Sequence, residues 1–93
     1  MLTLEEAKEY LRIDIADEDK TVENLLKSAI NLCMDVARID SETDFAQAGE
    51  ISKAAVLYTL GYLYSHRGDD EIDLHALTLK LRSILFGIRQ KGF

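Results

Sequence analysis

The sequence predicts an all-α fold, a compact bundle of four helices in a single domain spanning residues 1–93. The chain contains no Pro and only five Gly, so few residues interrupt helices. Apolar residues recur at helical spacing in several segments. One segment, residues 54–65, is apolar on every side and must therefore be buried on every side. We expect it to lie in the third and central helix of the bundle, or to have one face covered by another subunit.

The first two helices are predicted from their caps and apolar stripes. Thr3 and Glu6 have the spacing of a capping box, which opens a helix that ends near Leu11. After a break, Asp17 is placed to cap a second helix by accepting hydrogen bonds from first-turn N–H groups. The apolar stripe of this helix comprises Val22, Leu25, Leu26, Ala29, Ile30, Cys33, Val36 and Ala37.

The second half of the chain predicts two more helices. Residues 39–49 are polar and acidic, and we expect a loop with room for one helical turn, anchored by Phe45. The apolar helix follows from about Gln47 to Arg67. Asp73 is placed to cap the last helix. The stripe of that helix comprises Leu74, Leu77, Leu81, Ile84, Leu85 and Ile88. We find no internal repeat.

Charge and composition exclude several classes of function. Eleven basic residues against seventeen acidic ones give a net charge of −6, which disfavours a protein that grips nucleic acid. The single cysteine excludes an internal disulfide. The apolar segment is too short to cross a bilayer, which needs about 20 residues. Charged residues in the first thirteen positions argue against a signal peptide, so we expect function without export.

We predict no catalytic residue, no cofactor and no metal site. His66 and His75 are nine residues apart, which fits no zinc motif. Cys33 lies on the apolar stripe of the second helix and is expected to be a buried structural thiol. The acidic loop fails as a calcium site, because Phe45 and Ile51 occupy the positions that need Gly and Glu.

Apolar residues away from the core stripes are candidate contacts with other subunits. Two flank the stripe of the second helix, and two form a second apolar face on the last helix. The C-terminal segment adds apolar residues and cations to an otherwise acidic chain, a typical composition for a docking segment. The alternative interpretation of this C-terminal segment is a fraying helix end whose cations complement the helix dipole. The candidate contact residues are Leu32, Met34, Leu79, Phe86, Ile88, Arg89, Lys91 and Phe93.

Three blocks of sequence carry a family resemblance. Residues 2–8 (LTLEEAK), 11–14 (LRID) and 17–19 (DED) precede an amphipathic helix. Residues 54–67 form an apolar helix that ends in an aromatic and then a basic residue. Residues 85–88 are a hydrophobic-Phe-Gly-hydrophobic element. In these blocks the chain resembles the small phage head-tail connector proteins, also called head-completion or DNA-packaging adaptor proteins.

The resemblance implies an all-helical structural protein without enzymatic activity or a cofactor. Members of the family assemble into a homo-oligomeric ring under the portal vertex, where the ring extends the DNA channel and provides the tail attachment platform. The implied partners are other copies, the phage portal protein and the tail or next connector protein. DNA would pass through without specific binding, and no membrane is involved. The implied location is the virion head-tail interface, after synthesis in the host cytoplasm, with residues 86–93 as a peg that enters the portal.

Two other classes of function stay open at this point. A small helical protein–protein interaction or regulatory module would show the same amphipathic stripes without forming a ring. A small enzyme is disfavoured, because no catalytic constellation appears. Gene neighbourhood would distinguish an interaction or regulatory module from a connector, since flanking portal, capsid and tail genes would support the connector.

Overall fold

The computed structural model describes residues 2–13, 16–66 and 73–86, and within these residues all regular structure is helical. The elements are α1 (Leu4–Leu11), the 3₁₀ helix η1 (Ala16–Glu18), α2 (Asp19–Ala37), α3 (Glu42–Ala46), α4 (Glu50–Ser65) and α5 (Leu74–Leu85). The all-α prediction is confirmed. The count of four helices is wrong, because the described residues contain five α-helices; the fifth is the five-residue α3, in the segment predicted as a loop with room for one helical turn.

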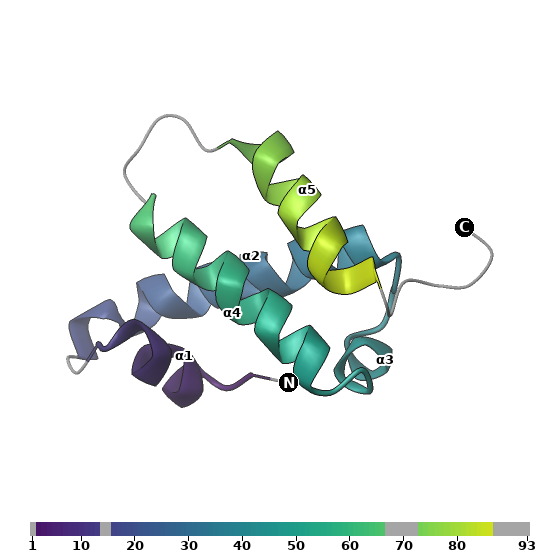
Figure 1. Cartoon of the computed structure of the whole chain (residues 1–93). Coiled ribbons are helices and arrows are strands. Elements are labelled where there is room, and N and C mark those ends of the chain that lie inside the picture. Colours follow the sequence, from purple (N-terminus) through teal and green to yellow (C-terminus); the bar gives the residue numbers. More distant parts are fainter. Residues whose placement is uncertain (1, 14–15, 67–72, 87–93) are drawn as a thin grey trace.

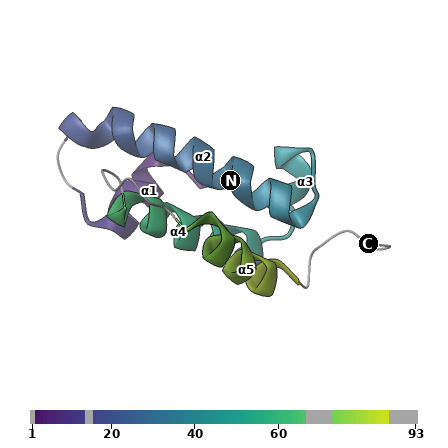
Figure 2. The ribbon, with the colours of Figure 1, turned by 90° about the horizontal axis from the view of Figure 1, so that it is seen from above.

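The helices form two layers (Figure 1). Figure 2 shows α2 along one side and α4 with α5 along the other, while α1 and α3 lie near opposite ends of α2. Both α2 and α4 contact each of α1, α3 and α5, and they also contact each other. The apolar helix α4 thus contacts every other α-helix, but its place is not unique, because the 19-residue α2 reaches the same neighbours.

The core lies between the two layers, and the buried hydroxyl side chains of Ser52 and Thr59 both have hydrogen-bond partners. Thr59 is fully buried on α4 and donates a 2.9 Å hydrogen bond from Oγ1 to the Ala55 carbonyl. Ser52 donates a 2.8 Å bond from Oγ to the Gly49 carbonyl. Each buried hydroxyl thus has a partner, as a stable interior requires. The inner side of α5 adds Leu77, Leu81 and Leu85.

The predicted side-chain caps are confirmed in two cases and wrong in one. Thr3 and Glu6 form the reciprocal capping box of α1. Asp73 caps α5, with its Oδ1 accepting a 2.9 Å hydrogen bond from the Ala76 N–H. Asp17 does not cap α2, because it lies within η1 and Glu18 holds the N-cap position. Glu18 already has helical backbone angles, so the extended conformation that a side-chain cap needs is absent.

The segment between α2 and α4 is more ordered than its polar sequence predicts. Ser41 caps α3 by accepting a 3.4 Å hydrogen bond from the Asp44 N–H. Phe45 is fully buried, which confirms it as the anchor of this segment. Gly49 adopts φ 70°, a conformation that glycine accepts without strain, and α4 starts at the next residue. The apolar helix therefore begins three residues later than the predicted Gln47.

Helices α1 and α2 end in the same way. Arg12 and Arg38 both have a left-handed backbone with φ 60°. The N–H of the next residue, Ile13 or Ile39, reaches back to a carbonyl five positions earlier at 2.9 and 3.0 Å, the pattern of a Schellman motif. The tripeptide Arg-Ile-Asp occurs at 12–14 and 38–40, a local repeat that sequence analysis overlooked because it is only three residues long.

Candidate protein-contact surfaces

The thiol of Cys33 is buried between the two central helices. Its side chain is fully inaccessible, and Sγ lies 3.4 Å from Thr59 Oγ1. Burial raises the pKa of this thiol to about 11, and the opposing effect of the Thr59 hydrogen bond is smaller. The predicted buried position is confirmed. Because the thiolate is disfavoured at neutral pH, Cys33 is suited to packing and not to nucleophilic attack.

The two histidines have different surroundings. The His66 ring stacks on Tyr62, with centroids 4.1 Å apart, and its Nδ1 lies 2.8 Å from the Tyr62 carbonyl oxygen. His75 is exposed on α5. Within the described ranges, no group of three His, Cys, Asp or Glu side chains could hold a metal ion. None of the helices in those ranges is long and apolar enough to cross a membrane.

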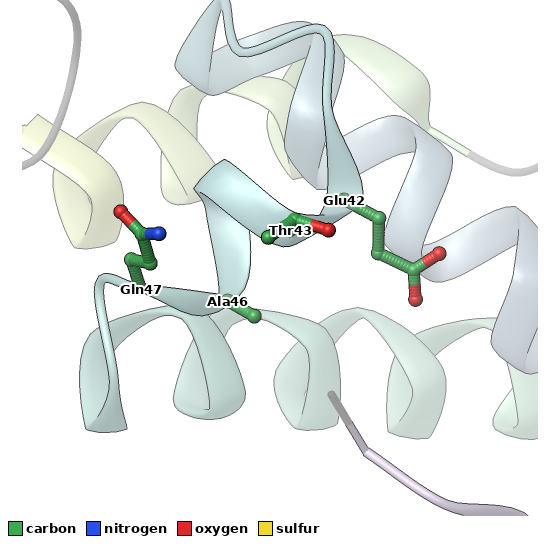
Figure 3. Close-up of a pocket in the computed structure, with 4 residues that line it drawn as sticks. All are labelled: Glu42, Thr43, Ala46 and Gln47. Carbon is green, nitrogen blue, oxygen red and sulfur yellow. The ribbon is translucent and has the colours of Figure 1, made fainter.

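A solvent-open hollow lies along α3. Figure 3 shows Glu42 and Gln47 at its two ends, with Thr43 and Ala46 between them. A site this open does not enclose a small ligand, which normally buries most of its surface in a cleft. The hollow belongs to a strongly acidic stretch, since no Lys or Arg occurs between Arg38 and Lys53. We call its exposed acidic side chains the α3 acidic surface: Asp40, Glu42, Asp44 and Glu50.

The outer side of α4 exposes apolar residues that the chain itself partly covers. Ile51 and Tyr58 are 40% and 37% exposed. Lys80 places its Nζ 5.9 Å from the centre of the Tyr58 ring, within the range of a cation–π contact. The Tyr10 ring lies over Gly61, with Cε2 3.4 Å from where a Cβ would stand. Side chains from α1 and α5 thus border this face on two sides.

The outer side of α5 is apolar and cationic. Leu79 is 49% exposed and Phe86, directly after the helix, is 77% exposed. At seven residues apart they differ by only about 20° around the helix axis. Lys80 and Arg82 are exposed near them, and α5 contains no acidic residue. We call Leu79, Lys80, Arg82 and Phe86 the α5 outer face.

The structure divides the predicted contact residues into three groups. Leu79 and Phe86 are exposed on the α5 outer face. Leu32 and Met34 are half-buried and pack against the core, and Leu32 also lines a groove between α2 and α5. The remaining four lie outside the described residues: Ile88, Arg89, Lys91 and Phe93.

Sequence reasoning missed other exposed apolar residues. Tyr10, Ile51, Tyr58 and Leu74 are all at least 37% exposed. Ile51 and Tyr58 are seven residues apart on α4, the same spacing that singled out Leu79 and Phe86 on α5. The sequence predicts that either the bundle or another subunit covers this face of the apolar helix, and it does not distinguish these two residues as exposed.

These features define a small all-helical protein whose described surface offers apolar and charged faces for contact with other proteins. A family model described as Phage gp6-like head-tail connector protein matches residues 1–88 of the chain. The chain belongs to this family, which confirms the resemblance seen in the sequence. The family is structural and places the chain at the junction of phage head and tail. No curated protein and no solved structure matches the chain.

Proposed function

We propose that the chain is a subunit of a homo-oligomeric ring at the head-tail interface of a phage or prophage particle. The ring docks on the portal protein, extends the DNA channel and provides the platform for the tail or the next connector protein. The observation that carries this proposal is the family match, which covers residues 1–88 of a 93-residue chain. The subunit is made in the host cytoplasm and acts without catalysis.

The surface of the chain supports a role in assembly. A closed ring needs two different faces on each subunit, because each copy contacts one neighbour with one face and the other neighbour with another. The described residues provide two exposed apolar faces. One is formed by Ile51 and Tyr58 on α4, and the other by Leu79 and Phe86 on the outer side of α5. Clustered exposed apolar groups are typical of sites that other proteins cover.

The net charge supports a channel through which DNA slides. At −6, the chain lacks the cationic excess that neutralises phosphates, so it should leave passing DNA unbound. We expect negligible affinity for duplex DNA at physiological salt in a fluorescence-anisotropy titration. Micromolar or tighter binding would contradict this part of the proposal.

The test of the proposed function uses the phage or prophage that encodes the chain. Deleting the gene should yield heads without attached tails, and supplying the wild-type chain from a plasmid should restore tailed particles. Purified chain mixed with the portal protein of the same genome should add a ring of density in negative-stain images. A normal yield of infectious, tailed particles from the deletion would overturn the proposal, as would the absence of the chain from purified virions.

A further inference from the structure

We propose that the α5 outer face of one subunit docks on the α3 acidic surface of a second copy of the chain. The contact joins unlike faces, so it leaves one free face of each kind and can propagate from copy to copy. The inference rests on the proposed function, to which it adds the two surfaces that meet.

The two apolar residues of the α5 outer face lie on the side of the helix opposite the core, and its two cations lie on the flanks, Lys80 toward Tyr58 of α4 and Arg82 at the groove between α2 and α5. Leu77 and Leu81 are at most 1% exposed, whereas Leu79, between them in the sequence, is 49% exposed. Phe86 extends the apolar side and is the most exposed large apolar residue among those described. An aromatic side chain flanked by cations has the composition of an interface anchor.

The α3 acidic surface offers the complementary chemistry. Of its four carboxylates, Glu42 stands at one end of an open hollow whose middle is formed by Thr43 and Ala46 (Figure 3), and the other three are exposed on the same short stretch of chain. An exposed Phe or Leu side chain would find apolar atoms there. Glu42 at the rim, with the exposed carboxylates near it in the sequence, would pair with Lys80 and Arg82 of the neighbour, and such complementarity fixes register and orientation.

The two surfaces are placed so that one copy can use both at once. α3 lies near one end of α2 and contacts both α2 and α4, while α5 runs beside α4 (Figure 2). Each surface therefore remains open to a different neighbour.

Other occupants of the α5 outer face fit less well. Pairing it with the same face of a second copy would bring two sets of cations together, which costs free energy. Nucleic acid would meet two cations in a chain of net charge −6. The outer side of α4 lacks a comparable charge, and Tyr10 and Lys80 already border it.

Charge reversal tests the contact in the full chain. The first variant carries Lys80→Glu and Arg82→Glu, and the second carries Glu42→Lys and Asp44→Lys. Sedimentation at low salt, with circular dichroism as the check on folding, should show that each variant alone self-associates at least about tenfold more weakly than wild type. A mixture of the two should recover association, because each reversed face then meets a neighbour of opposite charge.

Matched controls separate a local contact from a general change in net charge. Lys20→Glu with Lys27→Glu on α2, and Glu5→Lys with Glu9→Lys on α1, alter the net charge by the same amounts at exposed positions. They should leave self-association near the wild-type value. Phe86→Ser should weaken association without changing the helical signal.

The outcomes that overturn the contact are specific. A wild-type chain that stays monomeric at about 1 mM in low salt overturns it. Normal self-association of the variant with Glu42→Lys and Asp44→Lys also overturns it. The same holds if a mixture of the two charge-reversal variants does not recover association. Failure here leaves the proposed function intact if the chain still binds the portal, while self-association through these faces without portal binding would reject the proposed function alone.

Discussion

Helices α4 and α5 both carry more apolar residues than one core-facing stripe needs, but the fold uses the surplus differently. On α4, the exposed apolar side is bordered by Tyr10 from α1 and by Lys80 from α5. On α5, Leu79 and Phe86 face away from the core and are among the most exposed apolar residues described. Exposure alone therefore does not identify a docking face, and the useful criterion is whether the chain already covers the residue.

The largest expected effect tests the buried side of α4. Leu60 is fully buried, so Leu60→Asp places an unpaired carboxylate in the core at a cost of several kcal/mol. That cost is comparable to the roughly 5–10 kcal/mol expected for the whole domain. We expect loss of the helical circular dichroism signal. Tyr58→Asp on the exposed side of the same helix is the control and should stay folded; equal damage from both would erase the distinction between the two sides.

The next effect compares the two sides of α5. Leu81→Ala removes a fully buried side chain and should lower the free energy of unfolding by about 2–5 kcal/mol in urea titrations. Leu79→Ala, on the outer face, should change it by less than about 0.5 kcal/mol. If Leu79→Ala in the monomeric chain costs as much as Leu81→Ala, the outer face is part of the core after all.

A smaller effect concerns the Cys33–Thr59 contact between the central helices. The pKa of Cys33 is about 11 in the folded chain, above its ordinary value of 9.0. The folded state therefore holds the thiol proton more tightly than the unfolded state does. The contribution of this protonated thiol to the free energy of unfolding is fully present below pH 9 and is lost as the pH rises toward 11. We expect a decline of roughly 2 kcal/mol in the free energy of unfolding across that interval.

Cys33→Ala provides the matched control for this pH dependence. Removing the thiol should flatten the decline in denaturant titrations between pH 9 and 11, even if the variant is less stable at pH 7. A thiol that reacts with an alkylating agent at pH 8 as fast as a free peptide would show that Cys33 is accessible, contrary to its position in the fold.

The smallest effect tests how closely α1 covers α4. Gly61 lies in a helix interior, where Ala is favoured over Gly by up to about 1 kcal/mol. A Cβ at this position would stand 3.4 Å from Tyr10 Cε2, an ordinary contact distance. Gly61→Ala should therefore raise the midpoint of thermal unfolding by a few degrees. Gly61→Val should lose that gain, because a γ-methyl group beyond this Cβ would push against the Tyr10 ring.

The helix starts could be predicted where the capping interaction is local. Thr3 with Glu6 and Asp73 with Ala76 each join residues three positions apart, so the sequence contains everything that the bond requires. The helix α3 has an equally local cap, Ser41 with the Asp44 N–H, but a cap alone does not predict that a helix follows. Five residues are too few for intrinsic helix stability, and α3 depends on the burial of Phe45 by the rest of the fold.

The contact candidates show the same limit. The seven-residue spacing of Leu79 and Phe86 identified an exposed face correctly, because both positions lie directly opposite the core. Leu32 and Met34 lie beside the core stripe of α2, where exposure depends on whether another helix covers that side. The packing of α5 along α2 decides this for Leu32, and no single-helix pattern contains that information.

Arg38 ends α2 and so sets the direction in which the chain continues toward α3. If α2 continued for one more residue, the direction in which the chain leaves the helix would rotate by about 100° around the axis of that helix. In the proposed ring every copy would repeat this deviation, and the angles would add up around the circumference until the last subunit missed the first. In that ring, closure of the circle would depend on how accurately the left-handed turn at Arg38 fixes this angle.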